Sequence, residues 1–262
     1  MNKIREAFFA GKAFIPFITG GDPDLETTEK LLYALSAAGA DIIEIGIPFS
    51  DPIAEGPVIE AAHERALGAG CTVDRLFDLV SRVRAYIKAP LLFMTYYNPI
   101  FARGVSKFTE RCAVCGIDGL IVPDLPFEER GELLSPCVSN GLELISLIAP
   151  TTDARIAEIA KNSDGFLYCV SSLGVTGERH KLDNSAEGMV EQAKRVSDIP
   201  CAVGFGVSTA VQAREVTGFA DGVIIGSAIV RIAAEHGRDC VEPISRFARD
   251  IKQAICPGRH EG

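Results

Sequence analysis

A regular alternation of two kinds of segment constrains the fold of this chain more than any other feature. Eight short apolar runs are each followed by a polar turn and by a stretch whose apolar residues recur at helical spacing. In alternating βα units the strands form a parallel sheet covered by helices, so each strand is apolar along most of its length. The expected strands span residues 14–18, 42–47, 91–95, 120–122, 144–148, 166–170, 201–203 and 223–225.

Eight such units indicate a closed barrel rather than an open sheet. The chain has 262 residues, and neither a Gly/Ser-rich linker nor a block of charge divides it. The sequence therefore predicts a single-domain α/β fold, a (β/α)8 TIM barrel over residues 1–262. The expected helices span residues 25–38, 58–69, 106–115, 128–140, 153–161, 186–196, 209–217 and 241–255.

A weak internal repeat supports the barrel. An aspartate stands just before every second expected strand, at Asp41, Asp118, Asp164 and Asp221. Residues at this end of a barrel usually serve stability. We therefore expect these carboxylates to support helix-to-strand corners at the amino-terminal face.

The composition excludes several classes of partner and site. A net charge of -9 disfavours nucleic acid, because phosphate binding needs a basic surface. No apolar run reaches the roughly 18 residues that span a membrane, and the first residues lack the pattern of a signal peptide, so we expect a cytoplasmic protein. The cysteines lie mostly in apolar segments, and Cys112 and Cys115 form a lone CxxC, so we expect buried thiols and no metal site.

Glycine-containing loops point to an anion. In a barrel the active site is built from the loops that follow the strands. The loops "SSLGVTGE", "GFGVS" and "GSAIV" follow the last three expected strands, and their backbone N–H groups can approach an anion closely. Gly226 and Ser227 open a short helix whose N-terminus suits a phosphate. Ordinary turn glycines are the alternative, but three neighbouring loops favour a phosphate site.

Two acids in one region suggest acid–base chemistry. Glu44 stands inside the apolar run "IIEIGI". A buried, unpaired carboxylate has a raised pKa, which suits a general acid/base; a structural ion pair is the alternative. In the next loop, "SDPIAEGP", Asp51 precedes a proline and is expected to cap its own turn. Glu55 precedes Gly56 and can extend over the barrel mouth as a second acid.

Aromatic residues accompany these acids at the ends of strands. Phe17 ends the first expected strand, Tyr168 lies in the sixth, and "LLFMTYYNPIF" includes the third. Together they suit a small, flat aromatic ligand, although any one of them is more often a core residue.

Several of these stretches resemble a known family. "PFITGGDPD", "IEIGIPFSDPIAEGP", "MTYYNPIF", "IVPDLPFEE", "SSLGVTG", "VGFGVS" and "IIGSAIV" occur in the order found in the tryptophan synthase alpha subunit family, over residues 14 to about 230. The resemblance implies a lyase that cleaves indole-3-glycerol phosphate to indole and glyceraldehyde 3-phosphate in L-tryptophan biosynthesis. It also implies an α2β2 heterotetramer, in which the β subunit carries pyridoxal phosphate and this chain carries no cofactor.

The resemblance assigns roles to individual residues. It makes Glu44 the proton donor and acceptor, Tyr168 a contact of substrate and of that glutamate, and Glu55 the second carboxylate near the indole N–H. Asp124 matches an acid in the loop that faces the indole channel. The substrate-binding positions that it implies are Phe17, Met94, Tyr96, Thr176, Gly177, Gly206, Gly226 and Ser227.

Two positions depart from the family's pattern. Glu55 stands where the family usually has aspartate, and a misplacement of about 1 Å costs a rate factor of about a hundred, so we expect the loop around Ala54 and Gly56 to adjust. Ser172 stands where some members carry arginine, which concerns loop closure. Two alternatives stay open: a sugar-phosphate isomerase, disfavoured by the missing lysine or histidine bases, and a non-catalytic regulatory subunit, which Glu55 alone favours.

Overall fold

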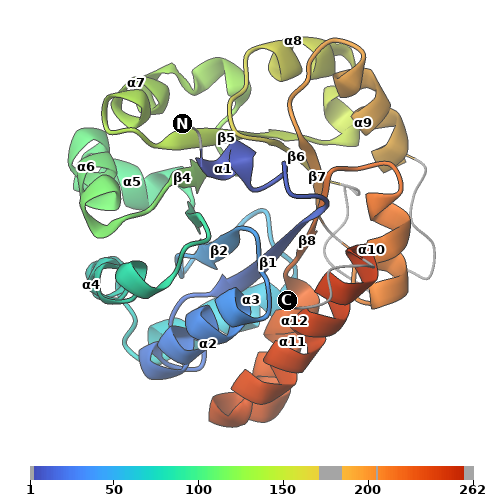
Figure 1. The fold of residues 1–262 in the computed structure, drawn as a ribbon. Helices are drawn as coiled ribbons and strands as arrows, with labels where there is room; N and C mark the ends of the chain where they lie inside the picture. Colours follow the sequence, from blue (N-terminus) through green and yellow to red (C-terminus); the bar gives the residue numbers. More distant parts are fainter. Residues whose placement is uncertain (1–2, 171–184, 205, 257–262) are drawn as a thin grey trace.

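The strands of the protein close into a barrel. The computed structural model describes residues 3–170, 185–204 and 206–256. Eight parallel strands pair in chain order, and β1 pairs with β8 at Phe14 and Val223 (Figure 1). The predicted (β/α)8 barrel is confirmed. The strands are β1 Ala13–Thr19, β2 Ile43–Gly46, β3 Leu91–Met94, β4 Gly119–Ile121, β5 Glu143–Ile148, β6 Leu167–Val170, β7 Cys201–Gly204 and β8 Gly222–Ile225.

Helices form a ring around the strands, except α1, which lies inside the ring in this view (Figure 1). They are α1 Lys3–Glu6, α2 Leu25–Ala37, α3 Pro57–Gly68, α4 Val73–Val83, α5 Tyr97–Arg103, α6 Val105–Cys115, α7 Gly131–Ser139, α8 Ile156–Lys161, α9 Ser185–Lys194, α10 Ala210–Thr217, α11 Ser227–His236 and α12 Val241–Ile255. Short 3-10 turns stand at Arg84–Tyr86, Phe127–Glu129, Pro150–Arg155 and Gly237–Asp239.

The core has two layers because successive strand residues point to opposite faces. One layer lies between the strands and the helix ring and includes Phe14, Ile45 and Phe93. The other fills the barrel and includes Ile15, Phe17, Leu92, Met94 and Tyr168. Glu44 has the same parity along its strand as Ile42 of the barrel interior, so its side chain points into the barrel.

The sequence missed two helices beside β3. Helix α4 begins after Thr72, whose hydroxyl accepts from the N–H of Arg75, and it buries Leu76, Phe77 and Val80. Helix α5 occupies Tyr97–Arg103, just after the expected third strand and within the aromatic stretch "LLFMTYYNPIF", for which the sequence predicts no helix. The expected helix over 128–140 is also divided, into a 3-10 turn and α7.

Three of the four repeated aspartates support corners as expected. The carboxylates of Asp41, Asp118 and Asp221 accept from the backbone N–H of Phe14, Leu91 and Cys201, at 2.7, 3.0 and 2.9 Å. Each bond joins the start of an even strand to the start of an odd one. Within the described ranges Asp164 makes no such bond, and its charged neighbour is Arg130.

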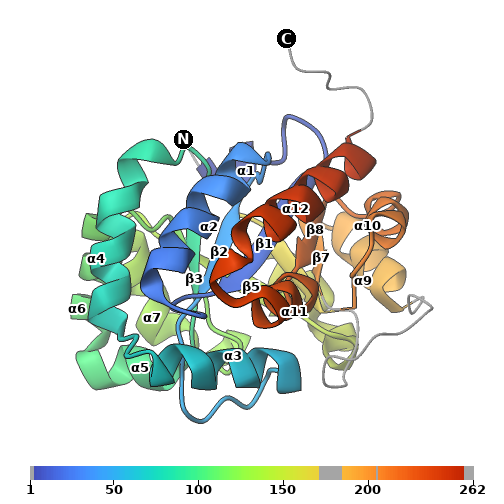
Figure 2. The ribbon, with the colours of Figure 1, turned by 90° about the horizontal axis from the view of Figure 1, so that it is seen from below.

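Different helices lie at the two ends of the barrel. In Figure 2, helix α1 lies toward one edge of the molecule, whereas α3 and α5, which follow strand carboxyl ends, lie along the opposite edge.

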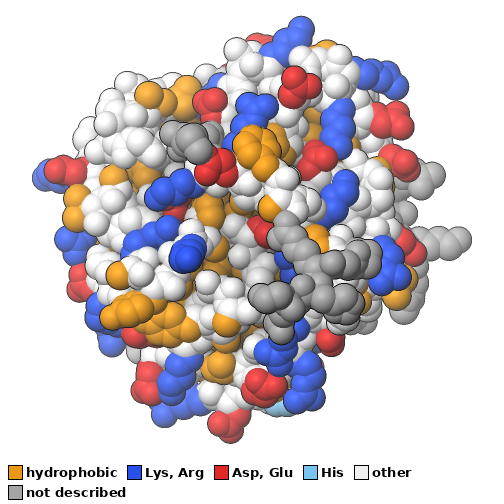
Figure 3. Space-filling view, viewed as in Figure 1, with side chains coloured by type: hydrophobic (Ala, Val, Ile, Leu, Met, Phe, Trp, Pro, Cys, Tyr) orange, Lys and Arg blue, Asp and Glu red, His pale blue; other side chains and the backbone are white. Residues whose placement is uncertain are grey.

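On the face that Figure 3 shows, basic and acidic side chains are interspersed. Within the described ranges, no helix is long and apolar enough to cross a membrane.

Candidate active site

A pocket opens among the carboxyl ends of the strands. Its empty volume is about 740 Å³ when the open solvent at its mouth is included. The predicted site residues among its walls are Phe17, Glu55, Met94, Tyr168, Gly206, Gly226 and Ser227. Residues that are distant in the sequence thus meet in one space, as the barrel topology requires.

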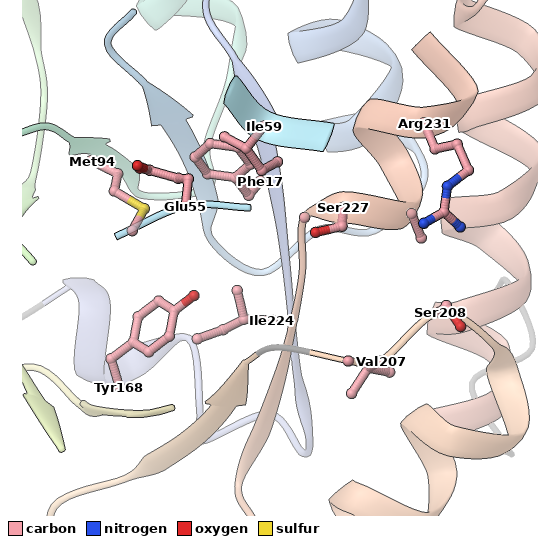
Figure 4. A pocket seen from close by; sticks show the side chains of 13 residues that line it. Phe17, Glu55, Ile59, Met94, Tyr168, Val207, Ser208, Ile224, Ser227 and Arg231 are labelled. Atoms are coloured by element: carbon pink, nitrogen blue, oxygen red, sulfur yellow. The ribbon is translucent and has the colours of Figure 1, made fainter. Parts of the chain in front are cut away.

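The pocket has two chemically different ends. Figure 4 shows Met94, Glu55 and Tyr168 toward one end, and Ser208 and Arg231 toward the other. Ser227 begins helix α11 and lies between these groups. No side chain among the described residues caps this helix start, so its first N–H groups are available to an anion. A ligand with a flat apolar part and an anionic part fits this division.

Glu44 lies in the barrel interior and outside the pocket wall. It is fully buried in β2, where its backbone is in register with Phe17 of β1 and Leu92 of β3. Neither carboxylate oxygen has a hydrogen-bond partner among the described residues. Burial raises the pKa of Glu44 well above the ordinary value of a glutamate. Nothing in the described structure supports the alternative of an ion pair.

Tyr168 connects the buried acid with the pocket. Burial raises its pKa well above the ordinary value, and the charges of Glu44 and Glu55 raise it further. The phenol therefore lies within the electrostatic reach of both acids. Tyr168 also lines the pocket itself.

Two glycines make room for the aromatic walls, a role that sequence reasoning did not assign to them. A methyl group on Gly204 would lie 2.7 Å from the Tyr168 hydroxyl, and one on Gly46 would lie 2.6 Å from the Phe17 ring. Both glycines end a strand, β7 and β2. A glycine at the last position of an apolar strand is the sequence signal that marks such a close approach.

Glu55 is held in the loop between β2 and α3. Its carboxylate accepts from the hydroxyl of Tyr96. Burial, aided by the charges of Glu60 and Asp124, raises the pKa of Glu55 to about 7. A carboxyl group with this pKa exchanges a proton near neutral pH.

Tyr96 and Asp124 shape the loops around the pocket. Tyr96 is 2% exposed and is not among the pocket walls; its hydroxyl accepts from the N–H groups of Ile53 and Ala54. The Asp124 carboxylate accepts from the N–H of Tyr97, at 2.9 and 3.1 Å, so it fixes the start of α5.

Among the described residues, Asp51 makes a local hydrogen bond, but with a neighbouring side chain and not with a backbone N–H of its turn. Its carboxylate accepts from the hydroxyl of the neighbouring Ser50 at 2.5 Å, in an exposed turn. Asp51 does not line the pocket, whereas Glu55 does. Of the two loop acids, Glu55 is therefore the one at the site.

Some predicted residues lie outside the described part of the chain, and some pocket residues were not predicted. Thr176, Gly177 and Ser172 lie outside the described residues. Arg231 could have been found, because it stands four residues after Ser227 and hence on the same face of α11. Val207, Ser208 and Ala228 lie in two of the glycine-containing loops that the sequence indicated, whereas Ile59 and Ile224 are pocket residues that it did not indicate.

The cysteines are structural. All eight are free, and all but Cys256 are buried. Burial raises the pKa of the Cys112 and Cys115 thiols, so this CxxC is poorly reactive. In the part of the chain that the structure describes, no group of three His, Cys, Asp or Glu side chains could hold a metal ion.

Comparison with known proteins gives a consistent result. A family model described as the tryptophan synthase alpha chain matches residues 7–255. The tryptophan synthase alpha chain of Synechococcus elongatus is 49% identical over 262 residues, which cover 97% of each chain. The crystal structure of tryptophan synthase subunit alpha from Legionella pneumophila superposes with a TM-score of 0.88 at 37% identity, covering 97% of this chain and 98% of that one.

A structure of a complex gives the same match. In the tryptophan synthase α2β2 complex of Pyrococcus furiosus, one chain superposes with a TM-score of 0.87 at 38% identity, covering 92% of this chain and 99% of that one. The similarities thus extend over nearly the whole chain and include both sequence and fold. The protein belongs to the tryptophan synthase alpha chain family.

Proposed function

We propose that the two-ended pocket binds indole-3-glycerol phosphate, and that Glu44 moves the protons that cleave it to indole and glyceraldehyde 3-phosphate. As a tryptophan synthase alpha chain, the protein is a carbon–carbon lyase of tryptophan biosynthesis. The observation that carries the residue assignment is the placement of Glu44, which is buried and unpaired among the described residues, in register with the Phe17 wall.

The substrate's two parts match the two ends of the pocket. The phosphate lies at the start of α11, near Gly226 and Ser227, with Gly206 on the facing loop. The indole ring lies between the apolar walls formed by Phe17 and Met94. Thr176 and Gly177 stay predicted phosphate-side contacts, on the family resemblance.

Glu44 acts first as an acid and then as a base. Its carboxyl proton goes to indole C3, which gives a cationic tautomer of the ring. The Glu44 carboxylate then takes the proton of the glycerol hydroxyl next to that carbon. An aldehyde forms as the carbon–carbon bond breaks, and the bonding electrons return to the ring. A raised pKa suits this cycle because the group must hold a proton at neutral pH before it gives it up.

Glu55 and Tyr168 support the charge that develops. A carboxylate at the indole N–H stabilises the positive ring, and Glu55 lines the indole end of the pocket. Tyr168 has its phenol within the electrostatic reach of both acids and orients the substrate against Glu44.

The proposed assembly places a second enzyme at the indole end. The partner is the tryptophan synthase β subunit in an α2β2 complex, and pyridoxal phosphate belongs to that subunit. We place the protein in the cytoplasm, where free thiols such as its eight cysteines stay reduced. The single domain is taken to span residues 1–262.

A steady-state assay of indole release tests the proposal. The purified chain should cleave indole-3-glycerol phosphate, and addition of a β subunit should raise the rate. Glu44→Gln should lower kcat by at least about a thousandfold while an unreactive indole-phosphate analogue still binds. Normal turnover in this variant would remove Glu44 from the mechanism.

A further inference from the structure

We propose that Tyr96 is a positioning residue for Glu55, and that its hydroxyl favours glutamate at this place in the loop. The part of this inference that concerns catalysis rests on the function proposed above, whereas the loop geometry does not. Tyr96 follows β3, and Glu55 lies 41 residues earlier, in the loop between β2 and α3. The two side chains meet at the carboxyl end of the barrel.

The Tyr96 hydroxyl makes three hydrogen bonds to one loop. It donates to Oε2 of Glu55 and accepts from the N–H groups of Ile53 and Ala54, at 3.0 and 2.9 Å. A phenol hydroxyl has one proton to donate. Because the two N–H groups occupy the acceptor side of the oxygen, that proton is directed at the carboxylate.

Packing fixes the ring that carries this hydroxyl. Tyr96 is 2% exposed, and its ring packs against that of Phe49 at a centroid distance of 5.4 Å. The backbone N and O of Phe49 both lie 3.3 Å from Nδ1 of His63, a buried residue of α3. The loop therefore contacts a rigid donor, and Glu55 has one preferred place for its carboxylate.

The length of the side chain at position 55 sets how closely its carboxylate approaches the Tyr96 hydroxyl. The N–H groups of Ile53 and Ala54 bind the same oxygen as the Glu55 carboxylate, which fixes the loop backbone relative to Tyr96. An aspartate on this backbone would hold its carboxylate up to about 1.5 Å farther from the hydroxyl, which weakens the contact. The additional methylene of glutamate thus has a defined structural use.

The other neighbours of Glu55 oppose its ionisation. The charges of Glu60 on α3 and Asp124 after β4 add to burial in raising its pKa to about 7. Tyr168 of β6 also faces it, since the charge of Glu55 raises the pKa of that phenol. A hydrogen bond donated to a carboxylate favours its ionised form. Loss of the Tyr96 hydroxyl therefore raises the pKa of Glu55 further.

A double-mutant cycle tests the inference. Tyr96→Phe is made in the natural chain and in Glu55→Asp, and Tyr97→Phe serves as the matched control because it removes the same atom from the neighbouring residue. Two readouts need no substrate: hydrogen exchange at the amides of Ile53 and Ala54, and the titration of the Glu55 carboxyl by carbon NMR, assigned with Glu55→Gln. The third readout is the kcat and KM of indole release.

Tyr96→Phe should speed exchange at both amides and raise the pKa of Glu55. Its kcat should fall about tenfold at pH 7 with KM changed less than about twofold, and the rise of activity with pH should move to higher pH. In Glu55→Asp, the Tyr96→Phe change should lower kcat by a smaller factor than in the natural chain, because the contact is already weaker. Tyr97→Phe should leave all three readouts unchanged.

Unchanged amide exchange in Tyr96→Phe would overturn the loop geometry. An equal loss of kcat on the glutamate and aspartate backgrounds would overturn the action through Glu55. If the natural chain failed to release indole, the proposed function would be wrong, yet amide exchange and the Glu55 titration would still decide whether Tyr96 positions this acid.

Discussion

At the scale of single residues, Glu44 and Glu55 share a raised pKa but differ in their surroundings. Glu44 lies inside the barrel without a hydrogen-bond partner among the described residues, whereas Glu55 accepts from Tyr96. The sequence predicted the burial of Glu44 because a charged residue interrupts an apolar strand. It did not predict the contact of Glu55 with Tyr96, because no local pattern links residues 41 positions apart.

The buried acid lowers the stability of the protein as pH rises. The pKa of Glu44 is higher in the folded chain than its ordinary value of 4.5, so above that pH the unfolded chain loses a proton that the folded chain keeps. The free energy of unfolding then falls with pH, by up to about 1.4 kcal/mol per unit, until the folded-state pKa is passed. Glu44→Gln should remove this fall. The variant should be more stable than the natural chain at pH 8, and this difference in stability should be much smaller at pH 5.

Chemical denaturation at pH 5 and pH 8 measures this difference. Glu64→Gln, at an exposed position on α3, is the control and should change the stability little at either pH. Equal stability of Glu44→Gln and the natural chain at pH 8 would contradict a raised pKa at Glu44.

Gly204 tests the close approach to Tyr168. A methyl group there would lie 2.7 Å from the Tyr168 hydroxyl, so Gly204→Ala should displace the phenol. We expect a loss of about 1–3 kcal/mol in the free energy of unfolding and a lower kcat. Gly188→Ala is the matched control: it lies in α9 with no atom within 4 Å of the added carbon, and it should stabilise the protein by about 1 kcal/mol. Unchanged kcat and stability in Gly204→Ala would show that the phenol has room to move.

At the scale of elements, the strands were easier to predict than the helices. Strands buried on both faces are apolar throughout, and all eight lie where the sequence places them. Helix α5 was missed because "TYYNPIF" is rich in residues common in strands, and its helical state depends on contacts such as that of Asp124 with the N–H of Tyr97. Helix α4 had a readable signal in the N-cap Thr72.

Helix α11 presents a testable anion site. Arg231 lies one turn after Ser227 and lines the same pocket. Arg231→Gln should raise KM for the phosphorylated substrate about tenfold and leave kcat within about twofold, because the charge acts on binding in the ground and transition states alike. Arg246→Gln, on the exposed side of α12, is the control and should leave KM unchanged. A fall in kcat at constant KM would instead assign Arg231 to the chemical step.

At the scale of the whole molecule, the barrel separates stability from chemistry. The amino-terminal end carries the corner aspartates, and the carboxyl end carries the pocket. The sequence predicted this separation because barrels build their sites on one set of loops. The sequence could not predict which of the four corner aspartates would lack the bond to a strand N–H. That residue is Asp164, for which the bond is missing among the described residues.

Asp118 provides the corresponding test. It accepts from the N–H of Leu91 and pairs with Lys3 and Arg84, at 3.3 and 3.6 Å. Asp118→Ala should cost about 1–3 kcal/mol in the free energy of unfolding, because a partly buried N–H loses its acceptor, while kcat and KM stay unchanged. Asp78→Ala, which breaks the exposed pair with Arg111, should cost less than about 1 kcal/mol. A large fall in kcat in Asp118→Ala would contradict the separation of the two ends.

The contact between Cys256 and Lys12 suits this chain to circular permutation. The Cys256 thiol donates to the backbone carbonyl of Lys12 at 3.5 Å, so the last described residue lies against the start of the first strand. In Figure 2, helix α1 and the end of α12 lie on the side away from α3 and α5. A short linker could therefore join the end of α12 to the start of β1, and new ends opened in the turn between α9 and β7 would leave the order of strands around the circle unchanged.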